Sequence, residues 1–212
     1  MQKLLVFDLD GTLIDSSDDL ANSVNLVRNQ LGLTSFNKEK IRSFIGNGIS
    51  KLVERSFADV KVDLSYILDR YREVYYENAV NKTYLYPDVF DGLKKLTQSG
   101  FINAVLTNKP GDVSRKILEK LSILPFFHSV IGAEDGYKLK PNTEGLRFLI
   151  NRFKIDNQSC WMIGDHHTDL IAGNDANVKT GFVTYGFGNM NHTKPTKQFT
   201  SFSDLVEYFL HK

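Results

Sequence analysis

The sequence predicts an α/β protein with a Rossmann-like parallel-sheet core that carries a large helical insertion. Five short apolar runs have the length and composition of buried strands, at residues 4–7, 102–106, 129–131, 160–163 and 181–184. Helical patterns separate the last four runs, near residues 111–121, 143–153 and 168–177. Strands buried on both faces that alternate with helices are typical of a parallel, doubly wound sheet.

The insertion lies between Asp15 and Tyr84, where the chain has helical periodicity and no convincing strand. Ser16 is a suitable N-cap for its first helix, and Asp19 favours the helix dipole. Further helices are expected near residues 38–44, 49–57 and 64–78, with the aromatic side chains of Phe57, Tyr66, Tyr71 and Tyr75 packed inside. We therefore expect a helical cap domain at 15–84 and a core domain at 1–14 and 85–212. Because sheet connections are usually short, an insertion of this length is expected to be a lid.

Composition narrows the class of protein. The 212 residues carry a formal net charge of +1 without a clustered basic face, so no nucleic-acid partner is expected. No run of residues is long and apolar enough for a membrane span, and the apolar run at the N-terminus is too short for a signal peptide. A cytoplasmic monomer or homodimer is expected. Cys160, the one cysteine, is expected to be a buried small hydrophobe.

The strongest chemical signal is Val6-Phe7-Asp8-Leu9-Asp10-Gly11-Thr12. The first strand runs directly into two carboxylates at i and i+2, which point the same way on an extended chain. Open α/β sheets bind ligands at this end of their strands. A cation or a shared proton must compensate two neighbouring carboxylates, and Mg²⁺ favours oxygen ligands. Gly11 allows a sharp turn, after which Thr12 can present its hydroxyl and amide to a phosphate.

Three further strand ends strengthen the signal. The second run ends in Thr107-Asn108-Lys109, where Thr107 offers a hydroxyl to a phosphoryl oxygen. The third is followed by Lys140-Pro141, whose ammonium can neutralise a carboxylate and a phosphate, with Lys138 as a rival for that role. The fourth ends in Gly164-Asp165, with Asp169 one helical turn later. Asp165 is placed to join the metal site, and Asp169 to brace the loop or the lysine. This order of groups suits phosphoryl transfer, which depends on positioning and charge neutralisation.

Taken together, these motifs resemble the four motifs of the haloacid-dehalogenase-like hydrolase superfamily, and the insertion resembles its helical cap. The resemblance implies that Asp8 is the nucleophile that forms an aspartyl-phosphate and that Asp10 is the general acid and base. It also implies that Thr107 and Lys140 hold the phosphoryl group, and that Asp8, Asp165 and the backbone carbonyl of Asp10 hold Mg²⁺. The substrate is then expected to contact Gly11, Thr12 and Asn108.

Two stretches are similar to phosphoglycolate phosphatases within this superfamily. One is residues 10–16 with the Asp19-Leu20-Ala21 that follows, and the more specific one is Ile45-Gly46-Asn47-Gly48 with Leu52-Val53-Glu54-Arg55. This similarity implies a small phosphorylated metabolite as substrate, with 2-phosphoglycolate the best single choice. The glycines permit close backbone approach, so we expect Gly46, Asn47 and Gly48 to face the core site and meet the distal anionic group of the substrate.

Other readings remain open. A sugar-phosphate mutase with the same type of cap, or a phosphatase for nucleotides or other sugar phosphates, would share all of the motifs. A dehalogenase or a capped phosphonate hydrolase would not need Asp10. A phosphorylated signalling receiver also uses Asp, Thr, Lys and Mg²⁺, but its acids are spaced differently and it has no lid. A catalytically inactive binding protein is disfavoured because every catalytic position is filled.

Overall fold

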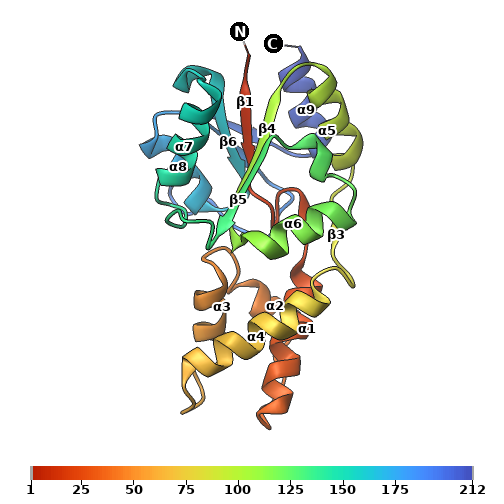
Figure 1. The fold of residues 1–212 in the computed structure, drawn as a ribbon, viewed down its shortest axis with the longest axis vertical. Coiled ribbons are helices and arrows are strands. Elements are labelled where there is room, and N and C mark those ends of the chain that lie inside the picture. Colours follow the sequence, from red (N-terminus) through yellow and green to blue (C-terminus); the bar gives the residue numbers. More distant parts are fainter. Residues whose placement is uncertain (1, 212) are drawn as a thin grey trace.

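The computed structural model describes residues 2–211 and contains a six-stranded sheet with a separate layer of helices beside one end of it (Figure 1). The strand order is β5-β4-β1-β6-β7-β8, and every neighbouring pair is parallel. The strands are β1 (Leu4–Phe7), β4 (Ile102–Pro110), β5 (Ser129–Ala133), β6 (Cys160–Gly164), β7 (Lys179–Val183) and β8 (Lys197–Phe199). The predicted α/β fold with a parallel sheet is confirmed.

Helices cover both faces of the sheet. The helices of the core are α5 (Val89–Gln98), α6 (Gly111–Lys120), α7 (Glu144–Phe153), α8 (His167–Asp175) and α9 (Phe202–Leu210), with short 3₁₀ turns at Leu124–Phe126 and Asn157–Ser159. In Figure 1, α7 and α8 lie on one side of the sheet, and α5 and α9 on the other. This is the doubly wound arrangement that the alternation of strands and helices predicts.

The central strand β1 shows why the sequence selects this fold. Leu5 and Phe7 pack with side chains of α5, α6 and α9, whereas Leu4 and Val6 pack with α7 on the opposite face. All four side chains are fully buried, which explains why the strand reads as a continuous apolar run rather than an alternating one. The next two residues along the chain, Asp8 and Leu9, therefore emerge at the carboxyl edge of the sheet.

The insertion forms four helices, α1 (Ser17–Gln30), α2 (Lys38–Arg42), α3 (Ile49–Ser56) and α4 (Leu64–Asn78), which lie below the carboxyl edge of the sheet in Figure 1. Two short strands, β2 (Ile14–Asp15) and β3 (Tyr84–Leu85), pair antiparallel where the chain enters and leaves these helices. We propose that this pair divides the chain into a core of residues 1–14 and 85–212 and a cap of residues 15–84.

Some local expectations differ from the structure. The Ser16 side chain does not cap α1 but donates a hydrogen bond to Asp10, and Asp19 is buried and accepts hydrogen bonds from the backbone of Lys82 and Thr83. The hydrogen bonds of Ser16 to Asp10 and of Asp19 to the backbone of Lys82 and Thr83 therefore replace the expected contacts of both side chains with the start of α1. The structure also adds β2, β3, β8, α5 and α9 to the predicted elements. Tyr66, which was expected to pack inside the cap, is exposed because it lies on the outer face of α4. Among residues 2–211, no helix combines the length and apolarity needed to cross a membrane.

Candidate active site

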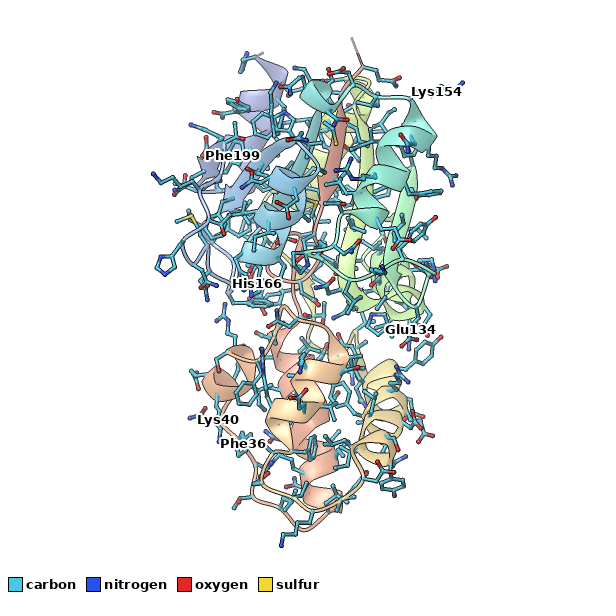
Figure 2. The ribbon with its side chains drawn as sticks, turned by 90° about the vertical axis from the view of Figure 1, so that its left-hand side faces the viewer. Phe36, Lys40, Glu134, Lys154, His166 and Phe199 are labelled. Carbon is cyan, nitrogen blue, oxygen red and sulfur yellow. The ribbon has the colours of Figure 1, made fainter. Side chains whose placement is uncertain are left out.

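A small cavity lies between the carboxyl edge of the sheet and the helices α1, α3 and α4. Its volume is about 50 Å³. The core contributes polar groups from the ends of β1, β4 and β6, and the cap contributes mostly apolar side chains, including Leu20, Ile49 and Leu52. Figure 2 shows His166 at the edge of the core that faces the helical layer. The cavity therefore joins three of the four strand ends that the sequence singled out, and Lys140, which follows the remaining one, contacts Asp8 without lining the cavity.

Asp8 is held by a lysine that is itself held by Asp169. The Nζ atom of Lys140 lies 2.9 Å from Asp8 Oδ1 and 2.6 Å from Asp169 Oδ1, and all three side chains are buried. Burial works against the positive charge of Lys140, but Asp169 and Asp8 outweigh it and raise its pKa above the ordinary value. Lys140 therefore stays charged beside the predicted nucleophile. Lys138, its predicted rival, is exposed.

Asp165 completes a group of three buried carboxylates. One oxygen from each of Asp8, Asp165 and Asp169 lies within 4.8 Å of the others, a spacing that is compatible with a metal ion. Burial, followed by the charges of Asp8 and Asp169, raises the pKa of Asp165 well above its ordinary value. Two backbone N–H groups, from Phe187 and Gly188, donate to Asp165 Oδ2 at 3.0 and 2.7 Å. The site thus concentrates negative charge that a divalent cation would balance.

Asp10 has a different set of partners. Both of its carboxylate oxygens accept hydrogen bonds from Lys109 Nζ, at 2.9 and 2.7 Å, and Oδ1 also accepts one from Ser16 at 2.5 Å. Sequence reasoning missed Lys109 and assigned Ser16 to a helix cap. No local signal identified Lys109, because β4 loses its regular register between Leu106 and Pro110 and strand alternation does not place its side chain there.

The remaining predicted core residues take two kinds of role. Thr107 is buried on the cavity wall, and its hydroxyl accepts a hydrogen bond from the Lys109 amide, so its own proton is left to donate to a ligand. Gly11 has a φ of +80°, and a Cβ there would lie 2.0 Å from Asp165 Oδ2, so the close approach requires glycine. Thr12 does not offer its polar groups to the cavity. Its amide donates to the Leu9 carbonyl and its hydroxyl lies 3.4 Å from Asp165 Oδ1.

The cap turn lies against the core, as the sequence predicts. Asn108 Nδ2 donates to the Gly46 carbonyl at 3.2 Å and to the Lys140 carbonyl at 2.9 Å, so Asn108 ties the turn to the lysine loop. Gly46 and Gly48 line the cavity, whereas Asn47 is not among the lining residues. A Cβ on Gly46 would lie 2.8 Å from the His166 ring. The turn is thus seated directly over the strand ends, and contact of its amides with substrate stays a prediction.

Comparison with known proteins agrees with this geometry. Residues 5–183 match the family model of haloacid dehalogenase-like hydrolases. The chain is 36% identical to a phosphoglycolate phosphatase of Psychrobacter arcticus, over 99% of this chain and 96% of that protein. It is 31% identical to a phosphoglycolate phosphatase of Aquifex aeolicus, over 97% and 95% of the two chains.

A solved structure is also closely similar. The crystal structure of a predicted phosphoglycolate phosphatase from Haemophilus somnus 129pt superposes with a TM-score of 0.93 at 29% sequence identity, covering 98% of each chain. The similarity therefore extends over both the sheet and the inserted helices.

Proposed function

Because this chain belongs to the haloacid dehalogenase-like hydrolase family, we propose that it is a Mg²⁺-dependent phosphatase that converts 2-phosphoglycolate to glycolate and phosphate. The observation that carries the proposal is the pairing of two strand-end carboxylates with separate lysines. Asp8 contacts Lys140, and Asp10 contacts Lys109. This arrangement supports Asp8 as the nucleophile and Asp10 as the group that transfers protons, since both line the same cavity.

The residues present fit a magnesium ion. Asp8 and Asp165 are buried carboxylates within ligand distance of a common point, and Asp165 is hard to keep charged without a cation. Asp169 belongs to the same cluster but already accepts hydrogen bonds from Lys140 and from the His166 amide, so we assign it to bracing the lysine. The Asp10 carboxylate is engaged by Lys109, which leaves its backbone carbonyl as the proposed ligand atom. When bound, Mg²⁺ would neutralise phosphoryl oxygens.

The proposed reaction has two steps on Asp8. In the first, a carboxylate oxygen of Asp8 attacks phosphorus, the bond from phosphorus to the ester oxygen breaks, and Asp10 donates a proton to the departing glycolate oxygen. In the second, Asp10 takes a proton from water while that water attacks phosphorus, which releases phosphate and restores Asp8. Thr107 and Lys140 neutralise and orient the phosphoryl oxygens, and the cap excludes bulk water from the intermediate.

The size of the cavity supports a small leaving group. A volume of about 50 Å³ has room for about four water-sized groups, judged from the space that a single buried water needs. Because Asp8 and Thr107 line the same cavity, this space must also take the phosphoryl group, so the leaving group has to be small. A hexose or a nucleoside is much larger than glycolate. The mutase and the nucleotide or sugar phosphatase are therefore disfavoured while the cap is seated as described here. The names of the similar proteins point to the same substrate.

A substrate screen tests the proposal. Purified protein is assayed for phosphate release from 2-phosphoglycolate, hexose phosphates and nucleoside monophosphates, with Mg²⁺ and with excess EDTA. We expect the highest kcat/KM for 2-phosphoglycolate and no turnover in EDTA. Ca²⁺ is expected to inhibit, because its looser geometry allows Asp8 to bind it through both oxygens. A preference for hexose phosphates would reject the substrate, and full activity in EDTA without tightly held metal would reject the mechanism.

A further inference from the structure

Two tyrosines of α4 that line the cavity, Tyr71 and Tyr75, have buried hydroxyls without a hydrogen-bond partner among the described residues. Ser16 lies beside the Tyr75 hydroxyl, whereas no such group within residues 2–211 faces that of Tyr71. Tyr71, on α4, is fully buried, and its Oη atom makes no hydrogen bond with the residues that the structure describes. Burial, and then the nearby Tyr75 and Asp10, raise the pKa of Tyr71 well above its ordinary value, so the hydroxyl keeps its proton and can donate it. Because an unmatched buried hydroxyl destabilises a protein, this one is expected to find its partner in a ligand.

One lysine supplies the positive charge on the same cavity. Among the lining residues that the structure describes, Lys109 is the only lysine or arginine. An ammonium group has three N–H donors, and hydrogen bonds to Asp10 account for two of them. Lys109 Nζ also lies 4.8 Å from the centre of the Tyr75 ring, which stacks on the Tyr71 ring at 5.7 Å. The ammonium of the core and the hydroxyl of the cap therefore border the same space.

The position of Lys109 relates this space to the phosphate site. Thr107 and Lys109 are two residues apart on β4, both line the cavity, and the Lys109 amide donates a hydrogen bond to the Thr107 hydroxyl. Thr107 is assigned to the phosphoryl group, so Lys109 lies on the same cavity as that group and close to it in the chain. We propose that Lys109 and Tyr71 bind the carboxylate of the leaving group and thereby determine specificity, an inference that rests on the proposed function.

The competing explanation is that Lys109 only positions Asp10. Two substrates separate these roles, 2-phosphoglycolate and 2-hydroxyethyl phosphate, in which a hydroxymethyl group replaces the carboxylate. Both have alkoxide leaving groups that need a proton from Asp10, but only one offers a carboxylate. The measured quantity is the ratio of their kcat/KM values, which cancels any general loss of catalysis.

For the lysine, the variants are Lys109→Met, which removes the charge at similar volume, and Lys109→Arg, which keeps it. Lys109→Met is expected to lower kcat/KM for both esters and to lower their ratio by a further 10- to 100-fold, roughly the contribution of a hydrogen bond to a charged group. Lys109→Arg is expected to recover part of that ratio. Equal losses on both esters in Lys109→Met would show that Lys109 only positions Asp10. They would overturn the inference while leaving the phosphoglycolate assignment intact.

For the tyrosine, the variant is Tyr71→Phe, with Tyr66→Phe on the same helix as a matched control, since Tyr66 is 60% exposed. Tyr71→Phe is expected to lower the ratio about fivefold. Its thermal midpoint should be unchanged or higher, because the change removes an unmatched hydroxyl. A lower thermal midpoint with an unchanged ratio of the two kcat/KM values would show that Tyr71 serves only in packing. It would overturn the proposed contact of Tyr71 with the carboxylate. A wild-type enzyme without preference for 2-phosphoglycolate over 2-hydroxyethyl phosphate would reject the substrate and the subsite together.

Discussion

The two carboxylates proposed for catalysis, Asp8 and Asp10, are separated by one residue, and their surroundings differ. Asp8 contacts Lys140, which is fixed by Asp169 in a wholly buried network. Asp10 turns to the cap side, where it meets Lys109 and Ser16. Asp8 is thus held toward the phosphate site, whereas Asp10 lies where a leaving group and an attacking water would pass.

Asparagine at the two positions should therefore give different kinetics. Asp8→Asn is expected to abolish turnover of every ester, because an amide is no nucleophile. Asp10→Asn is expected to lower kcat/KM for 2-phosphoglycolate by about 10²- to 10⁴-fold, the usual contribution of general acid catalysis. The loss on p-nitrophenyl phosphate should be smaller, since nitrophenolate leaves without a proton. Steady-state assays on both esters measure this, and equal losses in Asp10→Asn would remove its role as general acid.

Cys160 offers a test of burial that is independent of catalysis. It lies fully buried in β6, and burial raises the pKa of its thiol to about 12. The reactive thiolate is therefore scarce near neutral pH. We expect no alkylation by iodoacetamide at about pH 8 in the folded protein and complete alkylation in concentrated urea, as measured by intact mass. Rapid labelling of the folded protein would contradict the described packing of β6.

At the residue scale, the position of a residue at a strand end predicted its place in the site well, whereas the type of an isolated side chain predicted it poorly. The residues Asp8, Thr107, Lys140 and Asp165 come together because parallel strands end at one edge. Lys109 was missed because a lone lysine is usually solvated, and nothing local predicts that Asp10 and a tyrosine ring will bury it. Thr12 was assigned to phosphate because local sequence does not show that its amide closes a turn onto Leu9.

At the scale of elements, the turn between α2 and α3 is hydrogen-bonded to the core through Asn108. Gly46 has a φ of +107° and faces the His166 ring, so a methyl group there would meet both backbone strain and a clash. Gly46→Ala is expected to lower kcat/KM for 2-phosphoglycolate roughly tenfold, which corresponds to about 1–2 kcal/mol of strain. Kinetics and thermal midpoint are measured side by side.

A second glycine of the cap provides the control for that experiment. Gly32 has a φ of +71° but no atom within 4 Å of a Cβ placed there. Gly32→Ala should therefore lower the thermal midpoint through backbone strain and leave kcat/KM near the wild-type value. Equal kinetic losses in both variants would mean that the seating of Gly46 on His166 is irrelevant to turnover.

The helices of the cap are held together by a buried arginine. Arg28 on α1 is fully buried, donates to the carbonyls of Thr34 and Ser56, and makes a bidentate pair with Asp59. Arg28→Met leaves these carbonyls without a donor, so we expect the free energy of unfolding to fall by about 2 kcal/mol. Arg70→Met, at an exposed ion pair, should change it by less than about 1 kcal/mol. Urea unfolding measures both, and equal effects would contradict this account of Arg28.

Element lengths explain which parts of the fold the sequence predicted. The central strands are continuous apolar runs, and α4 begins and ends as predicted because its helical pattern is long. The edge strand β8 has three residues, two of them exposed, so no periodicity identifies it. It is recognisable only from its pairing with β7. The strands β2 and β3 have two residues each, which is too short to give a periodic pattern in the sequence.

At the scale of the whole molecule, contacts around the cavity rim hold the cap against the core. Arg72 on α4 pairs with Glu134, which Figure 2 shows at the core edge facing the cap, and Lys116 on α6 donates to the Tyr76 carbonyl. With the Asn108–Gly46 hydrogen bond, these contacts hold the cap against a cavity of about 50 Å³, which is small for a phosphate ester. Substrate entry would then require the cap to move, and such motions often control turnover.

The central claim is that phosphate passes through Asp8, and trapping the intermediate tests it most directly. Protein and Mg²⁺ are mixed with 2-phosphoglycolate labelled in its phosphate, quenched in acid within one turnover, and digested for mass spectrometry. The account predicts label on the peptide that contains Asp8, lost on treatment with hydroxylamine and absent from Asp8→Asn. Complete turnover with no labelled protein at any quench time, or label on another residue, would contradict it.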